Sequence, residues 1–317
     1  MSKKILLSGV KPTGRPHIGN YFGAMKQFVD LQDEYECYIF IADLHALTTL
    51  HDPKELASNV IDVATDYLAI GLDPEKVILF KQSDVPEVTE LSWIFNTLTT
   101  MPYLERAHAY KDAMAKGREV NVGTFDYPIL MAADILIQDA DMVPVGQDQK
   151  QHVEYARDTA EKFNRTYGKI FKLPEVLIEK NVAVVPGTDG EKMSKSHDNT
   201  IPLFADPDKI QKIVMSIVTD SVSDIPKNVY AIHRLFKDEK SLTALYEENR
   251  GKYKILKEAL FNDIVDFVSP LGARRAELAA KPEKLLEVLK IGGSKARERA
   301  ARKMESVRKL VGLSIYS

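Results

Sequence analysis

The chain has 317 residues, of which 44% are hydrophobic and 28% are charged, and its formal net charge is −3. This composition is ordinary for a soluble globular protein, and the length allows one large domain or two moderate ones. No run of about 18 uncharged apolar residues occurs, which excludes a membrane span, and the first apolar stretch is too short for a secretory signal. Cys37 is the only cysteine, so an internal disulfide and a cysteine-only metal site are excluded, and a reducing cytoplasm is the expected compartment.

The first half of the chain alternates short apolar runs with helical patterns. Buried strands are predicted at 5–8, 38–42, 77–80 and 141–145, with another at 182–185. Helices are predicted at 20–34, 53–70 and 149–167. Asp52 and Pro53 are typical of a helix start, and Gly71 of a helix end. This alternation predicts an α/β fold with a doubly wound, parallel, Rossmann-like sheet.

From about residue 205 onward, apolar residues recur at helical spacing and no strand pattern is found. We therefore expect an α/β domain over 1–200, an all-helical domain over 201–293, and a basic helix over 294–317 that packs back near the first domain. Seven basic residues between Ser294 and Lys309 stand against two acidic ones. Such a helix can hold nucleic-acid phosphates, although a solvated helix face is the commoner explanation of a charge run.

A loop rich in small residues follows the first predicted strand, in the segment 8–21. In a parallel sheet this position is the carboxyl end of the strands, where ligands bind. Gly9, Gly14 and Gly19 permit close backbone approach to a ligand, and Thr13 and His17 supply donors to phosphate oxygens. The segment has neither a dinucleotide fingerprint nor a P-loop. Taken alone, the segment is equally consistent with a phosphate-binding loop and with a surface turn.

A second segment, 190–199, contains two lysines three residues apart, interleaved with serines and preceded by glycines. A mobile cationic loop of this kind can follow the charge that moves onto a leaving pyrophosphate. A solvated surface turn is the usual explanation of such a loop. The presence of both segments, in this order, favours phosphate chemistry.

Together the two segments resemble the signature sequences of class I aminoacyl-tRNA synthetases. Residues 12–20 are similar to the HIGH signature, with Asn20 as its last letter, and 192–196 match the KMSKS loop in every letter. The resemblance implies that an amino-acid carboxylate attacks the α-phosphate of Mg-ATP, and that the adenylate is then transferred to tRNA. It makes Thr13, His17, Lys192 and Lys195 the catalytic residues. It places ATP against Lys11, Pro12, Thr13, Gly19, Asn20, Gly146, Gln147, Asp148, Lys192, Met193, Ser194, Lys195 and Ser196.

A helical pattern at 125–137, with Pro128 expected in its first turn, brings Tyr127, Met131 and Asp134 to one face. An aromatic ring, a thioether and a carboxylate could line a slot for a flat ring with one N–H, since an ionised carboxylate only accepts hydrogen bonds. Periodicity alone leaves open that Asp134 is exposed or pairs with a lysine.

The segments 127–136 and 143–152 resemble the tryptophanyl-tRNA synthetases, and the similarity continues through nearly the whole chain. The resemblance implies that Asp134 takes the indole N–H, while Tyr127 and Gln149 address the ammonium and carboxylate of tryptophan. It places tryptophan against Leu7, Gly9, His45, Tyr127, Met131, Asp134, Val145 and Gln149. It makes 1–200 the catalytic domain and 201–293 the domain that binds the tRNA anticodon. It also implies tRNA(Trp) as partner and a homodimer.

The sequence departs from the family pattern at Lys11, Leu7 and Gln147, where glutamine, an aromatic residue and glutamate are commoner. Lys11 could contact a phosphate or be an ordinary loop lysine, and His45 could line the site or be a packed strand-end histidine. Some relatives carry an iron–sulfur cluster, which one cysteine cannot ligate, so none is expected; no protein metal ligand is expected either. The alternatives are a tyrosine-tRNA ligase and an inactive paralogue that binds tryptophan or RNA.

Overall fold

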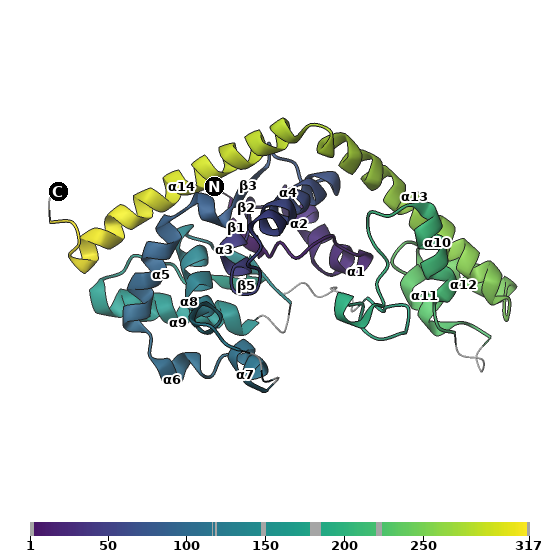
Figure 1. Ribbon diagram of the computed structural model, residues 1–317, viewed down its shortest axis with the longest axis horizontal. Coiled ribbons are helices and arrows are strands. Elements are labelled where there is room, and N and C mark those ends of the chain that lie inside the picture. Colours follow the sequence, from purple (N-terminus) through teal and green to yellow (C-terminus); the bar gives the residue numbers. More distant parts are fainter. Residues whose placement is uncertain are drawn as a thin grey trace.

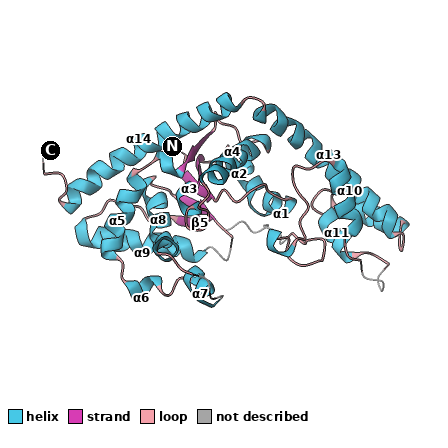
Figure 2. Cartoon of the chain, in the orientation of Figure 1, coloured by secondary structure: helices cyan, strands magenta, loops and turns pink. Residues whose placement is uncertain are grey.

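The computed structural model describes residues 3–115, 117, 119–146, 150–177, 185–219 and 224–315. These residues form a parallel sheet of five strands in the order β3-β2-β1-β4-β5, which lies at the centre of the wider part of the molecule (Figure 2). The strands are β1 (Ile5–Val10), β2 (Glu36–Ile41), β3 (Val77–Lys81), β4 (Met142–Pro144) and β5 (Glu175–Leu177). The predicted doubly wound α/β fold is confirmed.

The strand order reverses between β1 and β4, and a crevice at such a reversal is where open α/β sheets bind ligands. Four strand predictions are confirmed, because their β-branched and apolar runs are buried between helices. The strand predicted at 182–185 lies mostly outside the described residues. β5 was not predicted, since it has only three residues, of which Glu175 is exposed and the other two are partly buried.

Helices cover both faces of the sheet in the first half of the chain. They are α1 (Ile18–Asn20), α2 (Lys26–Leu31), α3 (Asp43–Ala46), α4 (Pro53–Ala69), α5 (Glu87–Leu98), α6 (Met101–Leu104), α7 (His108–Ala115), α8 (Val122–Ile137) and α9 (Lys150–Tyr167). Asp52 caps α4 by accepting hydrogen bonds from the amides of Lys54 and Glu55, and Pro53 opens the helix as predicted. The helix predicted at 20–34 is interrupted by a π-helical turn, Tyr21–Met25. Such turns are rare and are frequently found at functional sites.

From Pro207 onward, the regular secondary structure of the described residues is entirely helical, as predicted from the periodicity. Its helices are α10 (Pro207–Ser216), α11 (Lys227–His233), α12 (Glu239–Glu248), α13 (Tyr253–Ala279) and α14 (Pro282–Val311). Figure 1 shows α10, α11 and α12 grouped against α13 at one end, while α13 and α14 form an arch over the sheet. No helix in the described part of the chain is long and apolar enough to cross a membrane.

The last helix begins at Pro282, well before the predicted start at Ser294. In the sequence, Gly292 and Gly293 suggest a helix break, but both lie inside α14 and are buried. A Cβ atom on Gly292 would lie 2.0 Å from the carbonyl oxygen of Leu79 in β3. The glycines therefore allow the helix backbone to pack directly on the edge strand, which outweighs their low helix propensity.

Candidate active site

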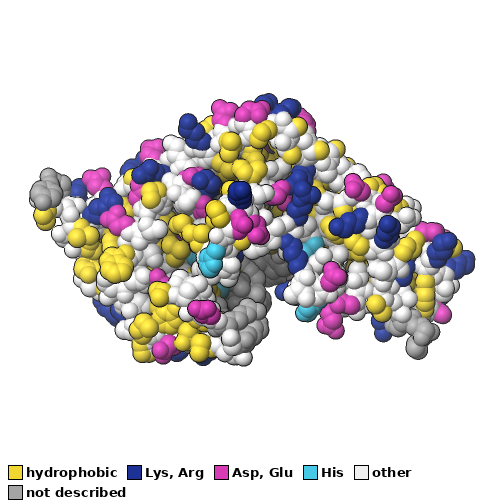
Figure 3. All heavy atoms as spheres, in the orientation of Figure 1, with side chains coloured by type: hydrophobic (Ala, Val, Ile, Leu, Met, Phe, Trp, Pro, Cys, Tyr) yellow, Lys and Arg dark blue, Asp and Glu magenta, His cyan; other side chains and the backbone are white. Residues whose placement is uncertain are grey.

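The carboxyl ends of the strands open into one large cavity of about 1180 Å³. Figure 3 shows the hollow between the sheet-bearing part and the helical group, on the side away from α14. The predicted site residues that line this cavity are Leu7, Gly9, Lys11, Thr13, His17, Asn20, His45, Tyr127, Met131, Val145, Gly146, Lys192, Met193, Ser194 and Lys195. Pro12, Gly19, Asp134 and Ser196 are not among the lining residues. Gln147, Asp148 and Gln149 fall outside the described residues.

Backbone hydrogen bonds join the first signature segment to the residues that directly follow the second. The amide of Ile18 donates to the carbonyl of Ile201 at 2.9 Å, and the amide of Leu203 donates to the carbonyl of Pro16 at 3.1 Å. In addition, the Lys195 ammonium donates to the carbonyl oxygen of Thr13 at 2.9 Å. The residues expected to handle phosphate therefore meet at one wall of the cavity.

His17 is the N-cap of α1 and forms a reciprocal pair of hydrogen bonds with Asn20. The Asn20 amide donates to His17 Nδ1 at 3.2 Å, and the His17 amide donates to Asn20 Oδ1 at 3.1 Å. Because Nδ1 accepts, the ring proton is on Nε2, which is left as a donor. Burial, and then the charge of Lys195, lower the pKa of His17 to about 4. His17 is thus a neutral hydrogen-bond donor at physiological pH.

Gly19 acts behind the cavity wall. A Cβ atom there would lie 2.9 Å from His17 Nδ1 and 3.2 Å from the Cβ of Met193, which is itself buried. A side chain at this position would push the capping histidine and the lysine-bearing loop apart. Gly19 therefore allows the two segments to pack closely together.

Asn199 holds the loop that carries Lys192 and Lys195. Its side chain is buried, accepts from the amide of Ser194 at 2.7 Å, and donates to the carbonyl of Lys192 at 3.1 Å and to Asp189 at 2.8 Å. The sequence analysis did not select Asn199, because a loop asparagine carries no signal that distinguishes it from an exposed one.

Lys11 reaches across the cavity mouth toward the end of α3. Its ammonium donates to the hydroxyls of Thr48 at 3.3 Å and Thr49 at 3.2 Å, and burial lowers its pKa. Lys11 thus lies at the cavity wall and is hydrogen-bonded to the residues that follow α3.

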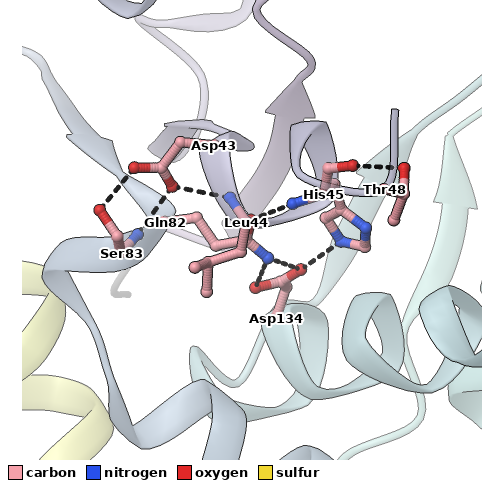
Figure 4. Close-up of polar contacts among 7 residues, drawn as sticks. All are labelled: Asp43, Leu44, His45, Thr48, Gln82, Ser83 and Asp134. Carbon is pink, nitrogen blue, oxygen red and sulfur yellow. Dashed lines mark hydrogen bonds and ion pairs between the residues drawn. The ribbon is translucent and has the colours of Figure 1, made fainter. Parts of the chain in front are cut away.

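The Asp134 carboxylate is held by two side chains from neighbouring strand ends (Figure 4). Gln82 Nε2 donates to Oδ1 at 2.9 Å and to Oδ2 at 2.8 Å, and His45 Nε2 lies 3.0 Å from Oδ2. Asp134 is 3% exposed, so both alternatives for it, exposure and a lysine partner, are wrong. Burial raises its pKa despite the opposing hydrogen bonds from His45 and Gln82.

A second carboxylate fixes the orientation of this group. Asp43 accepts from the amide of Ser83 at 2.9 Å and from the amide of Leu44 at 3.0 Å, which ties α3 to the end of β3. The backbone amide of His45 donates to Gln82 Oε1 at 3.2 Å, and this bond leaves the Gln82 amino group facing Asp134. The carboxylate does not itself line the cavity, but its partner His45 and its helix neighbour Met131 do.

Gln82 was missed from the sequence, although a signal for it exists. It is the first residue after β3, and the carboxyl ends of parallel strands meet at one edge of the sheet. A polar residue at this position is a candidate site residue by its position alone.

Tyr127 and Met131 lie on the cavity side of α8, as the helical spacing predicted. The helix begins at Val122, however, so Pro128 lies in its interior and not in its first turn; Asn121 provides the N-cap by accepting from the amide of Thr124. The Tyr127 hydroxyl lies 2.6 Å from His152 Nε2, and burial raises the pKa of Tyr127 to about 12.

The described residues include no group of three or more His, Cys, Asp or Glu side chains arranged to hold a metal ion. The cavity wall includes three lysines and the neutral His17, together with Tyr127, Met131 and His45, the last of which is bonded to Asp134 behind it. This arrangement suits an anionic phosphate chain at one end and a flat polar ring at the other.

Comparison with known families agrees with this geometry. The family model for class I tRNA synthetases specific for tryptophan and tyrosine matches residues 2–280. Two curated relatives, both tryptophan–tRNA ligases, match over 97% of this chain. The one from Fusobacterium nucleatum is 48% identical with 97% of its own length covered, and the one from Rhodopirellula baltica is 46% identical with 99% covered.

Solved structures give the same result. The tryptophanyl-tRNA synthetase of Campylobacter jejuni, complexed with ADP and tryptophan, superimposes with a TM-score of 0.92 at 44% identity, over 98% of this chain and 100% of that one. The enzyme of Mycoplasma pneumoniae gives a TM-score of 0.85 at 29% identity, with 99% of each chain covered.

Proposed function

This chain belongs to the class I tRNA synthetases specific for tryptophan and tyrosine, and we propose that it activates L-tryptophan with ATP and transfers it to tRNA(Trp). The observation that carries this proposal is the convergence of the two signature segments on one cavity that also reaches the Tyr127 and Met131 pocket. The ADP and tryptophan bound to the Campylobacter relative support both substrates.

In the first step, a carboxylate oxygen of tryptophan attacks the α-phosphorus of ATP. The bond to the oxygen that bridges to the β-phosphate breaks, and pyrophosphate leaves with both bonding electrons. His17 Nε2 donates to a phosphate oxygen as charge accumulates, and Lys192 and Lys195 hold the departing phosphates. No covalent enzyme intermediate is needed, because positioning and electrostatic stabilisation lower the barrier. In the second step, a terminal ribose hydroxyl of tRNA displaces AMP.

We further assign Asp134 as the acceptor for the indole N–H. Gln82 and His45 orient its oxygens, and Oδ1 has one remaining lone-pair position after the bond from Gln82. Tyr127 and Met131 pack against the indole ring, with Leu7, Gly9 and Val145 completing the pocket. The remaining predicted contacts, from Gln147 and Asp148 to ATP and from Gln149 to tryptophan, stay predictions.

Magnesium is expected to arrive with ATP. Mg²⁺ usually keeps several waters and binds to substrate phosphates with one or two carboxylates. The cavity wall fits this, because its carboxylates, Asp66, Asp112 and Glu119, form no three-ligand group. Bound Mg²⁺ would neutralise phosphate charge, while the chain's lysines and His17 position the phosphates.

Amino-acid-dependent exchange of pyrophosphate into ATP tests the proposed function. With a panel of twenty amino acids, exchange is expected with tryptophan and no other. Exchange with tyrosine alone would instead support the tyrosine-specific branch of the family. Absence of exchange with all twenty, in protein shown to be folded, would support a catalytically inactive paralogue.

We also propose that the chain forms a homodimer through a face next to the active site. A hollow of about 1000 Å³ is lined there by residues of α3, α5 and α8, and it shares Thr48 and Tyr127 with the main cavity. Trp93 is 71% exposed and Val122 is 81% exposed on this face. Large apolar side chains gathered around a hollow mark an interaction surface.

Trp93→Glu should convert the dimer to a monomer, because a charge would be buried at the centre of the interface. Sedimentation velocity at micromolar protein would measure the change. Ile315→Glu is the matched control, since Ile315 is 74% exposed outside this face. A wild-type protein that is already monomeric would contradict the proposal.

For tRNA, we propose that the helices of 201–293 bind the anticodon region and that α14 adds phosphate contacts. Some basic residues of α14 form ion pairs with other parts of the protein. Arg297 pairs with Glu87 at 3.0 Å, and Lys303 pairs with Asp139 at 2.5 Å. Figure 3 shows basic and acidic side chains intermixed along this helix. Lys295 has no ion-pair partner among the described residues, and Arg302 pairs only within its own helix. These two, with Lys309, which also pairs only within α14, are the candidates for phosphate contact.

Reversing Lys295 and Arg302 to glutamate should weaken tRNA affinity and lower the salt dependence of binding by about two phosphate contacts. Filter binding across a salt series would measure both. Lys54→Glu, on an exposed turn of α4, is the charge-matched control. An unchanged slope would leave α14 with a purely structural role.

A further inference from the structure

Two cavity-lining side chains, Tyr127 of α8 and His152 of α9, form a polar contact that the proposed mechanism does not use. The Tyr127 hydroxyl lies 2.6 Å from His152 Nε2. The two rings meet edge to face, with centroids 5.5 Å apart and planes at 73°. Both side chains are half-buried and line the active-site cavity, so the pair is within reach of a bound substrate.

The surrounding packing fixes the position of the Tyr127 ring. α8 and α9 pack against each other, and both contribute to one buried apolar cluster, Ile129 from α8 and Val153 from α9. The Tyr127 ring also meets the imidazole of His45, which belongs to α3, with centroids 6.1 Å apart. The phenol thus contacts two histidines from different elements, and its oxygen is directed at His152.

The Tyr127 hydroxyl has one proton to donate and lone pairs that accept hydrogen bonds. Burial raises the pKa of Tyr127 to about 12, so the hydroxyl keeps its proton at neutral pH. The separation of 2.6 Å falls in the range of bonds donated by O–H groups and just below the range of bonds donated by N–H groups. This distance favours donation from the hydroxyl to Nε2, with the ring proton of neutral His152 on Nδ1.

The direction of this bond decides what the phenol oxygen offers to a substrate. An ammonium group has only donors, so a hydroxyl that meets it must accept, and the hydroxyl proton must go to another acceptor. His152 provides that acceptor. Tyr127 precedes Asp134 by about two turns of α8, a rise of about 10 Å. With the indole N–H at Asp134, Tyr127 therefore lies toward the charged end of the amino acid.

Building on the proposed activation of tryptophan, we propose that His152 is a positioning residue for recognition of the substrate's ammonium group. It takes the Tyr127 proton and leaves the phenol oxygen as an acceptor toward the ammonium. The site thereby distinguishes an α-amino acid from an indole acid that lacks the amine. Without an acceptor at position 152, the hydroxyl proton turns toward the cavity and opposes the ammonium.

His152→Phe tests this, because it keeps a flat ring beside Tyr127 and removes the acceptor. The dissociation constant for tryptophan, measured by calorimetry, should rise roughly 10- to 100-fold, the effect of one hydrogen bond to a charged group. In pyrophosphate exchange, KM for tryptophan should rise in parallel, with kcat within about 3-fold. His152→Gln, whose amide oxygen can accept from the hydroxyl, should recover most of the affinity. Should His152→Phe fail to fold, His152→Leu removes the same acceptor and carries the same expectation.

Two analogues identify the group that the pair recognises. Tryptamine keeps the ammonium and lacks the carboxylate, whereas indole-3-propionate keeps the carboxylate and lacks the ammonium. His152→Phe should weaken the binding of tryptamine by the same factor and leave that of indole-3-propionate within about 2-fold. Equal weakening of both analogues, as a merely structural role would give, overturns the proposal. Weakening of indole-3-propionate alone, or unchanged binding of tryptophan, does so too.

His108→Phe is the matched control. His108 is exposed at the start of α7 and does not line the cavity. The same replacement there should leave the dissociation constant for tryptophan within about 2-fold.

A double-mutant cycle with Tyr127→Phe shows whether His152 acts through the hydroxyl. In the Tyr127→Phe background, His152→Phe should change the dissociation constant for tryptophan by less than about 2-fold. A full effect in that background overturns the proposal. Wild-type protein that neither binds tryptophan nor catalyses exchange contradicts the proposed function itself.

Discussion

Alanine in place of Asp134 should reduce the preference for tryptophan over phenylalanine from roughly 10⁴–10⁵ to about 10², measured as the ratio of kcat/KM values in pyrophosphate exchange. Phenylalanine is rejected because it would leave a buried, oriented acceptor without a partner. Without the carboxylate, only the shape of the pocket distinguishes the two rings. Tryptophan activation should fall, and phenylalanine activation should rise relative to it.

The same change leaves Gln82 and His45 without their shared acceptor. We expect the variant to lose about 1–3 kcal/mol of stability for this reason. Asp134→Asn is the control, because it keeps one oxygen acceptor and the side-chain shape. An unaltered tryptophan-to-phenylalanine ratio in folded Asp134→Ala protein would falsify the assignment of Asp134.

Lys195→Ala should lower kcat for adenylate formation by roughly 10²–10³, with the dissociation constant for tryptophan unchanged within about 2-fold. Lys195 lies at the phosphate end of the cavity, next to Thr13 and away from the aromatic pocket. Single-turnover kinetics and tryptophan titration separate the two quantities. Lys195→Arg, which keeps the charge, should recover part of the rate.

A second measurement checks the placement of Lys195. Its charge is one of two causes that lower the pKa of His17 to about 4, the other being burial. Removing the lysine should therefore raise the pKa of His17 toward its ordinary value of 6.5, which NMR titration of the imidazole would show. If the pKa stays at its wild-type value, Lys195 does not act on His17 and its assigned place in the site is wrong.

The parts of the fold that the sequence predicted are those in which local pattern and tertiary burial agree. β1 to β4 are apolar because they are covered by helices on both faces, and Asp52 with Pro53 marks a helix start by local chemistry alone. The start of α14 could not be predicted in this way. Gly292 and Gly293 are typical of a break, and only the contact with Leu79 in β3 explains a continuous helix there.

The active site shows the same division. His17 and Lys195 were predicted because their segments have recognisable order and composition. The side chains that hold them or the specificity pocket, such as Asn199 and Gln82, act through long-range hydrogen bonds. Asp66 looks like one more charge on an amphipathic helix, yet it is buried and pairs with Arg275, more than 200 residues away. Contacts of that range have no signature in local sequence.

The hydrogen bonds between the segments at 16–18 and 201–203 have a consequence for the nascent chain. During synthesis, the first signature segment leaves the ribosome long before residues 201–203. The hydrogen bonds between the two segments cannot form until residue 203 has also been made. Closing so long a loop costs entropy that only the finished packing repays. β3 is covered later still, because Gly292 of α14 is made after residue 203. The growing polypeptide is therefore expected to bind nucleotide only late in synthesis. A chain truncated before α10 is expected to bind no ATP.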